Sequence, residues 1–248
     1  MAKIEEFLDI PAQCELGNVI YKKLFYENME LKKADRDIFI KYVDKIRWCY
    51  SLKENNINIK KFQDEKLEYD EIEFINVYLK APNKLKRLAD IIMRTIPYPM
   101  VLSFEYGNEI RIFTGHQRIN LADSTKNTIE EYIYTDWIDL NNLDELDNEL
   151  FENLKIQNLS FTNFYTFYND IIEAIIKYNA SKLSGGSSIV LPVEEMKSIY
   201  DEIKAIDYEI ELIQAKIKKE TQFNRIVELN MEIKGLKDKR EELRGRLN

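Results

Sequence analysis

The sequence predicts an α+β protein: an N-terminal mixed sheet of about four strands, then helices, then a C-terminal antiparallel coiled-coil hairpin. Three patterns support this prediction. Residues 71–114 alternate between strand-like and helix-like stretches, residues 162–178 have helical periodicity, and the last quarter carries two heptad repeats. We expect an α/β domain at 1–155, an aromatic helix with a Gly/Ser loop at 156–190, and the hairpin at 191–248.

The first long element is expected at 35–51, where apolar side chains recur at helical spacing. The segment 71–79, EIEFINVYL, is rich in β-branched and aromatic residues and nearly apolar on both faces, which is typical of a central strand. A helix over 84–95 and a strand over 100–106 follow. Together these three elements predict a right-handed crossover between parallel strands.

The strand over 100–106 is expected to continue into a hairpin. Gly107-Asn108 is a two-residue turn that favours this connection, and EIRIFT (109–114) is the return strand. A further strand is expected near 130–138. The acidic segment 141–154 and the aromatic segment 162–178 predict two helices, and the second of these precedes the Gly/Ser cluster.

The composition excludes several kinds of chemistry. One histidine, His116, and two cysteines, Cys14 and Cys49, are too few for an ordinary zinc site. The sequence has no glycine-rich phosphate loop, so we expect no ATP hydrolysis, no metal and no cofactor. The net charge of −8 argues against a surface built as a whole for nucleic acid. No long apolar run and no signal-peptide pattern appear, which predicts a cytoplasmic protein without a membrane span.

Two heptad repeats predict a pair of C-terminal helices. In each repeat, seam residues recur at alternating spacings of three and four, which places them along one side of a helix. The repeats are out of phase, with the break within 218–225. We expect two helices folded back on each other, and a single long helix with a phase skip is the alternative. The seam residues are Ile199, Ile203, Ile206, Ile210, Ile213 and Ile217 in the first repeat, and Ile226, Leu229, Ile233, Leu236 and Arg240 in the second.

The charges of this region favour helix pairing. Residues 193–217 hold 3 basic and 7 acidic groups, a net charge of −4, and residues 218–248 hold 9 basic and 6 acidic groups, a net charge of +3. Opposite charges suit a hairpin within one chain and pairing between two copies equally well. Arg240 is unfavourable in a closed apolar seam, so we expect the seam to be open there or a partner to supply an acid.

Acidic residues on the predicted strands give an enzymatic alternative. A metal-dependent nuclease places acids on neighbouring strands, with an ExK motif, to hold Mg²⁺. Glu73, Glu105 and Glu109 are the candidate ligands, and Glu109-Ile110-Arg111 is the nearest approach to that motif. An always-charged arginine is a poor substitute for a lysine that orients water. We therefore favour a protein without catalytic residues.

A row of basic residues is the candidate nucleic-acid contact. Lys80, Lys84, Arg87 and Arg94 lie on or just before the helix over 84–95, where one face of the helix would present them to phosphates. A solvated outer face is the alternative. Because the whole chain is acidic, we expect weak, salt-dependent binding without sequence preference. His116 fits no motif and is interpreted as a residue of a surface loop.

Several short motifs, taken in order, resemble a known family. They are KKLFYEN, IRW, IPYP at Ile96–Pro99, FEYGN and the late segment KKETQFNRIVELNMEIKGLK. With these motifs the chain resembles the uncharacterised family DUF4391 over nearly its whole length, heptads included. The family has no established activity to carry over. Its members tend to be encoded beside helicases and DNA methyltransferases of restriction-like antiviral loci, so the resemblance implies an accessory subunit of such a system.

Two hypotheses from different classes follow. In the first, the chain is a non-enzymatic accessory or scaffold subunit of a prokaryotic antiviral complex. Its coiled coil and α/β domain would bind a helicase or DNA methyltransferase of the same locus, with a second copy and DNA as further candidate partners. In the second, it is a metal-dependent nuclease or another nucleic-acid-processing effector. The two differ in whether the sheet gathers two or more of the candidate acids and a lysine in one cleft.

Overall fold

The computed structural model describes residues 4–28, 31–119, 127–129, 131–186 and 189–247. The chain divides into two compact units, Met1–Ile175 and Ile176–Asn248. The division falls inside α7 (Phe164–Ser184), whereas the sequence pattern placed its boundaries at the aromatic helix and the Gly/Ser loop. The first unit combines helices with a mixed sheet and the second contains a helical pair, which confirms the predicted α+β class.

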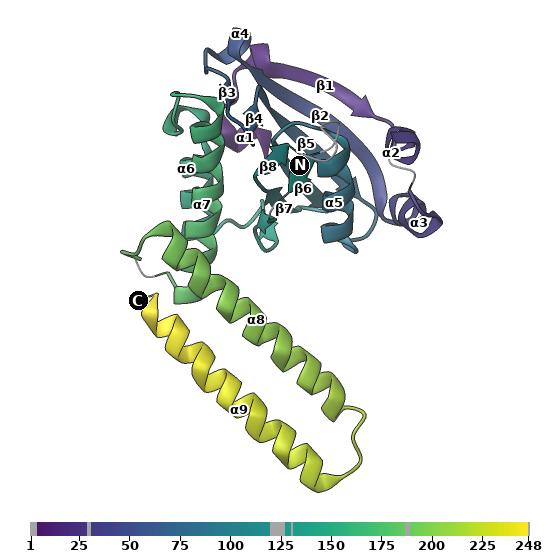
Figure 1. Cartoon of the computed structure of the whole chain (residues 1–248), viewed down its shortest axis with the longest axis vertical. Helices are drawn as coiled ribbons and strands as arrows, with labels where there is room; N and C mark the ends of the chain where they lie inside the picture. Colours follow the sequence, from purple (N-terminus) through teal and green to yellow (C-terminus); the bar gives the residue numbers. More distant parts are fainter. Residues whose placement is uncertain (1–3, 29–30, 120–126, 130, 187–188, 248) are drawn as a thin grey trace. The chain divides into compact units, whose positions relative to one another are not determined.

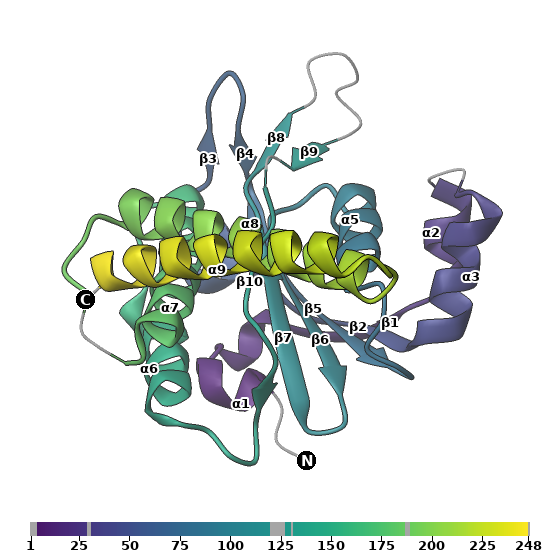
Figure 2. The ribbon, with the colours of Figure 1, turned by 90° about the horizontal axis from the view of Figure 1, so that it is seen from below.

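A mixed sheet is the centre of the first unit (Figure 2). Its strand order is β1-β2-β5-β6-β7-β10, and β11 also pairs with β7, so among the described residues this sheet has seven strands where about four were predicted. Among the described strands, only β5 and β6 pair in parallel. The strands are β1 (Glu15–Ile20), β2 (Val43–Lys53), β5 (Glu71–Leu79), β6 (Met100–Tyr106), β7 (Glu109–Thr114), β10 (Ile133–Tyr134) and β11 (Ile138–Asp139).

The prediction of one helix over 35–51 is wrong in its second half. Helix α3 (Lys33–Tyr42) stops, and the chain continues as β2, which pairs with β5 along its length. The register of that pairing shifts twice, at irregularities of the bulge kind. A bulge adds a residue to one strand, so buried side chains such as Val43, Ile46 and Cys49 recur every three residues instead of every two. This spacing is close to the helical period of about 3.6 residues, which explains the wrong prediction.

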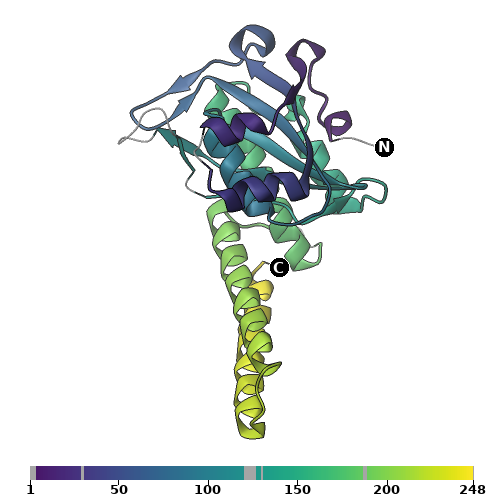
Figure 3. The same cartoon turned by 90° about the vertical axis from the view of Figure 1, so that its right-hand side faces the viewer.

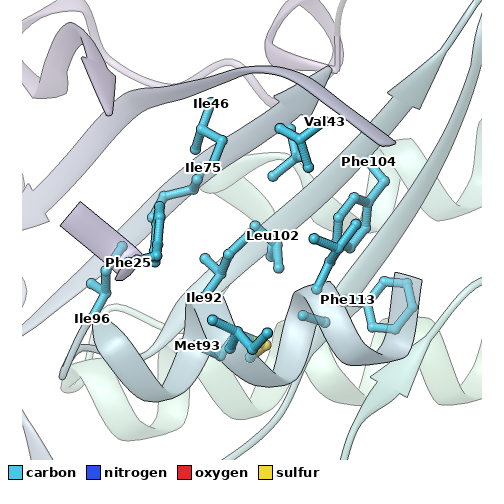
Figure 4. Packing of buried hydrophobic residues seen from close by; sticks show 14 of the residues in the cluster. Phe25, Val43, Ile46, Ile75, Ile92, Met93, Ile96, Leu102, Phe104 and Phe113 are labelled. Carbon is cyan, nitrogen blue, oxygen red and sulfur yellow. The ribbon is translucent and has the colours of Figure 1, made fainter. Parts of the chain in front are cut away.

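The segment from β5 to β7 folds as the sequence predicted. Helix α5 (Leu85–Thr95) connects the parallel strands β5 and β6, and β7 returns from β6 through Gly107, whose φ is 63°. Leu102 and Phe104 of β6 belong to the core that α5 covers, and Figure 4 shows part of this packing. Helices α2 (Lys23–Asn28) and α3 contribute further side chains to the same core.

The remaining elements of the first unit are short. Helix α6 (Glu145–Leu154) occupies the acidic segment as expected, and the first part of α7 packs on the sheet, where Tyr168 donates a hydrogen bond to the carbonyl of Met100. The other elements are α1 (Glu5–Leu8), η1 (Ala12–Cys14), α4 (Glu54–Ile57), β3 (Phe62–Gln63), β4 (Glu68–Tyr69), β8 (Gln117–Ile119), β9 (Asn127–Ile129) and η2 (Ile156–Asn158).

The second unit contains the predicted pair of helices. Helices α8 (Val193–Ile217) and α9 (Phe223–Arg246) run side by side in opposite directions (Figures 1 and 3). The turn between them lies where the heptad phase breaks, so the alternative of a single long helix is wrong. In the turn, the Glu220 carboxylate accepts hydrogen bonds from the backbone N–H groups of Thr221 and Gln222, which lowers the pKa of Glu220.

Candidate functional site

Glu73 is an acidic residue in the interior of the sheet. Strand β5 places it on the same face as Ile75, and its side chain has no exposed surface. Trp48 Nε1 and Ser51 Oγ, both from β2, donate hydrogen bonds to its carboxylate, the second at 2.8 Å. Burial raises the pKa of Glu73 to about 7, although the two donors favour the ionised form. This residue therefore changes its charge near neutral pH inside the protein.

A cleft of about 540 Å³ opens next to this buried acid, at the end of β2 and the start of β5. Glu71, two positions before Glu73 on the same face of β5, has a side chain only 12% exposed. The Nζ atom of Lys53 on β2 lies 2.5 Å from Glu71 Oε2. This hydrogen bond raises the pKa of Lys53. The cleft is lined by Lys53, Glu54, Asn55, Lys61, Asp70, Glu71 and Tyr98.

The motif IPYP supplies one wall of the cleft. Tyr98 lines it, and burial together with the neighbouring charge of Glu71 raises the pKa of Tyr98. The carbonyl of Tyr98 accepts a hydrogen bond of 2.9 Å from Gln117 Nε2, and the carbonyl of Pro99 accepts one of 3.0 Å from the Glu73 N–H. These two hydrogen bonds hold the backbone of the motif beside Glu73.

The cleft is polar and its lysines are paired with acids. Besides the Lys53–Glu71 pair, Lys61 Nζ lies 2.8 Å from Asp70 Oδ2. No group of three or more His, Cys, Asp or Glu side chains in the described part of the chain is placed to hold a metal. An acid with a pKa near 7 beside a cleft is found at many acid–base sites. Glu73 is fully covered, however, so it can alter the charge balance of the cleft but cannot touch a ligand there.

The three acids of the nuclease hypothesis do not come together. Successive residues of a strand point to opposite faces of the sheet. Glu73 lies near the start of β5 on the face that α5 covers, while Glu105 of β6 lies on the other face and accepts a hydrogen bond of 2.7 Å from Asn76. Glu109 is exposed at the β6–β7 turn, at the opposite end of these strands. These positions do not form one metal site.

Two members of the basic row are held by acids. Arg87 donates two hydrogen bonds to the Asp35 carboxylate, at 2.8 and 2.7 Å, and a third to Asp90 at 2.7 Å. Arg94 donates to the same Asp90 at 2.5 Å. The hydrogen bonds from Arg87 lower the pKa of Asp35, and they join α5 to α3. The two arginines therefore have a structural role in the first unit.

The two lysines of the row lie before α5 rather than on its face. Lys84 immediately precedes the helix with a φ of 61°. Lys80 Nζ donates to the carbonyl of Ile40, and Lys22 Nζ donates to the carbonyl of Val43. Burial, and then the charge of Lys80, lower the pKa of Lys22. Lys80 and Lys22 thus bind carbonyls at the end of α3, and the four predicted positions do not form one continuous row on a helix.

The heptad seam packs between α8 and α9. Its centre is buried from Ile199 to Ile213, and the positions nearest the turn are partly exposed. The buried seam residues are Ile199, Ile203, Ile206, Ile210, Ile213, Leu229 and Ile233, and the partly buried ones are Ile217, Ile226, Leu236 and Arg240. Burying an isoleucine side chain contributes about 1.5–3 kcal/mol, so this seam accounts for much of the stability of the pair.

Arg240 corrects our expectation of an open seam. Its Nη1 atom donates a 3.0 Å hydrogen bond to Asp207 Oδ1 on α8. The required acid therefore comes from the opposite helix of the same chain, not from a partner. The pair spans the two helices and raises the pKa of Arg240.

The helical pair also keeps large apolar side chains on its outside. Tyr208 and Leu212 of α8 are 63% and 45% exposed. Phe223, Val227 and Met231 of α9 are spaced four residues apart and are 76%, 41% and 70% exposed. None of these five positions belongs to the closed seam, so they are not required to hold the two helices together.

His116 does not lie free in a surface loop as interpreted from the sequence. Its Nδ1 atom is 2.6 Å from the hydroxyl of Tyr69, which is fully buried. The imidazole stacks on Tyr165 with 5.4 Å between ring centroids, and Tyr165 stacks in turn on Phe62. The histidine and the aromatic helix α7 thus share one packed cluster with a structural role.

Several residues that contact Glu73 or line the cleft could not be found from the sequence. Trp48, Ser51 and Lys53 were missed because residues 35–51 were interpreted as a helix, which removed β2 from the sheet. The segment Glu71-Ile72-Glu73 could have indicated this site, since two acids two residues apart on an apolar strand share one face. A buried acid in such a strand requires hydrogen-bond donors on the neighbouring strand.

The fold and the site define an α+β protein with a polar cleft in its sheet unit and a separate helical pair. The family model DUF4391, described as a domain of unknown function, matches residues 8–239. The chain belongs to this family, which confirms the resemblance of its motifs. No curated protein and no solved structure gives a significant match. Among the described helices, none has the length and apolar character needed to cross a membrane.

Proposed function

We propose that this chain is a non-enzymatic accessory or scaffold subunit of a prokaryotic antiviral defence complex, and that its C-terminal helical pair binds the protein partner. One observation carries the proposal. The pair closes its own isoleucine seam and still exposes large apolar side chains, among them Phe223 and Met231. Exposed apolar surface of this kind marks interaction sites in soluble proteins. Aromatic residues and methionine are also enriched at protein interfaces.

The proposed partner is a helicase or DNA methyltransferase of the same locus, as the gene neighbourhood of the family suggests. DNA then reaches the complex mainly through that partner. Little in the first unit favours direct DNA binding, because Arg87 and Arg94 are bound to Asp35 and Asp90. The nuclease alternative has no comparable support, since its three acids lie at separate places in the sheet.

Co-expression with the neighbouring genes tests the proposal. The full-length chain should co-purify with the helicase or methyltransferase of its locus. Replacing Phe223 and Met231 together by lysine should weaken this binding at least about tenfold, because removing a hot-spot residue at the centre of an interface costs about 2 kcal/mol or more. The matched control replaces Tyr106 and Phe161, exposed apolar residues of the first unit, by lysine. Loss of binding in the control alone would contradict the proposal.

A further inference from the structure

Strand β1 forms one edge of the sheet, and few of its features would prevent another strand from pairing with it. Only β2 lies beside it among the described residues (Figure 1). The outer side of an edge strand presents backbone N–H and C=O groups that no neighbouring strand pairs. Glu15 is its one charged residue and it has no proline. Gly17, with a φ of 66°, lies where the register with β2 shifts, and Asn18–Ile20 is the regular part of the strand.

The surroundings of this edge are apolar. Leu16 and Val19 on β1 are 42% and 45% exposed, and Tyr21 and Leu24 just after it are 72% and 47% exposed. Natural edge strands usually carry charges that prevent another strand from adding to the sheet. An edge with apolar side chains and few charges favours such an addition.

We propose that β1 pairs antiparallel with β1 of a second copy, so that the sheet continues across a two-fold axis near Val19. The charges near β1 favour a second copy of this chain as the partner, and they favour antiparallel pairing. Glu15 stands at the start of β1 and has no ion pair among the described residues. Lys23, the first residue of α2 after the strand, is 77% exposed and lies 3.1 Å from Glu27 of its own helix, in an exposed pair of the kind that contributes little stability. Antiparallel pairing brings the acidic start of each strand toward the basic end of the other. A parallel pair would oppose Glu15 to itself.

This dimer is closed, because the same patch of each copy contacts the other. It is formed by the sheet unit, whereas the partner surface proposed above belongs to the helical pair. The inference therefore extends beyond the proposed function and does not depend on it. A two-fold axis at Val19 sets this side chain directly opposite its own copy, where cross-strand Cβ atoms are about 4.5–5.5 Å apart.

Sedimentation velocity of the full chain over a wide concentration range is the first test. We expect a dimer whose dissociation is favoured by Val19→Lys and unaffected by Tyr106→Lys, an exposed position on another strand. Glu15→Lys and Lys23→Glu should each weaken the dimer, and the double variant should restore it. A wild-type chain that stays monomeric at every concentration overturns the proposal. So does a dimer that Phe223→Lys disrupts and Val19→Lys leaves intact.

Cysteine cross-linking tests the position of the axis. Val19→Cys should form a disulfide between two copies under mild oxidation with diamide. The control is Val190→Cys, which is 92% exposed and therefore reports random collisions. Cross-linking at Val19 that is no faster than at Val190 would show that β1 does not meet β1. Because both substitutions are at exposed positions, circular dichroism should show unchanged folds.

Discussion

Glu73 makes the stability of the sheet unit depend on pH. Its pKa is raised from 4.5 to about 7 by burial, so the folded protein holds this proton more tightly than the unfolded chain does. The stabilisation from the protonated form is complete below pH 4.5 and is lost as the pH rises through 7. A buried acid that costs stability when ionised is tolerated here because Trp48 and Ser51 donate hydrogen bonds to it.

Glu73→Gln should therefore stabilise the protein at pH 8 and change little at pH 4.5. Glutamine keeps a carbonyl that accepts from Trp48 and carries no charge to bury. The predicted gain at pH 8 is up to about 3 kcal/mol, from about 1.4 kcal/mol for each pKa unit. Urea unfolding at the two pH values, followed by the tryptophan fluorescence of the first unit, measures it. Equal effects at both pH values would show that Glu73 titrates normally in the folded protein.

Arg240 and His116 show why single residues were hard to interpret from the sequence. Arg240 at a seam position indicated an opening, but its acid is Asp207, which lies 33 positions earlier and outside the heptad seam. His116 indicated a loop because it matched no motif, yet it is bonded to Tyr69, 47 positions away. In both residues the deciding partner is distant in the chain, and spacing in the sequence carries no information about it.

At the scale of elements, the helical pair was predictable because its pattern is local. The a/d repeat specifies which side of each helix is apolar, and the change of phase marks the turn. Strand β2 was not predictable, since its irregular register gives buried residues a spacing close to that of a helix. The cleft was lost with β2, because Lys53 lies on it. The strand over 71–79 was predicted correctly, but β2, the neighbouring strand that supplies the partners of Glu71 and Glu73, was not.

The seam predicts a sharp contrast between two substitutions in α8. Ile203 has no exposed surface, so Ile203→Asp should cost several kcal/mol and unfold the helical pair. Tyr208 is 63% exposed, so Tyr208→Asp should change stability by no more than about 0.5 kcal/mol. Thermal unfolding by circular dichroism measures the loss of helix. Both tryptophans, Trp48 and Trp137, lie in the first unit, so their fluorescence reports whether that unit stays folded.

An early loss of tryptophan signal with Ile203→Asp would contradict the separation of the two units. An equally large effect of Tyr208→Asp would contradict the assignment of its face as external.

At the scale of the whole molecule, charge limits direct contact with nucleic acid. The net charge is −8, and two of the four candidate cations are bound to acids. We predict that the chain alone binds duplex DNA weakly, without sequence preference and with a strong dependence on salt. Fluorescence anisotropy at low and physiological salt measures this. Lys84→Glu should weaken the residual binding, while Arg87→Glu should mainly reduce stability by breaking the bonds to Asp35.

Tight binding at physiological salt that Lys84→Glu leaves unchanged would show that the DNA-binding surface lies elsewhere on the chain.

In the function we propose, the two units of the chain have different roles. The sheet unit contains the titrating acid, the polar cleft and the β1 edge, and the helical pair supplies an external apolar surface for a partner. In this proposal the helical pair, and not the sheet unit, binds the helicase or methyltransferase. The binding surface runs from Tyr208 to Met231, where the exposed apolar side chains of α8 and α9 lie.

Hydrogen–deuterium exchange of the chain, free and with its partner bound, shows which unit the partner covers. Binding should slow exchange in peptides that cover Tyr208 to Met231, and Phe223→Lys with Met231→Lys should abolish that protection. Peptides from β5 and α5 should exchange at the same rate in both states. Protection confined to the sheet unit, with unchanged exchange across α8 and α9, would show that the partner binds the sheet unit and not the helical pair.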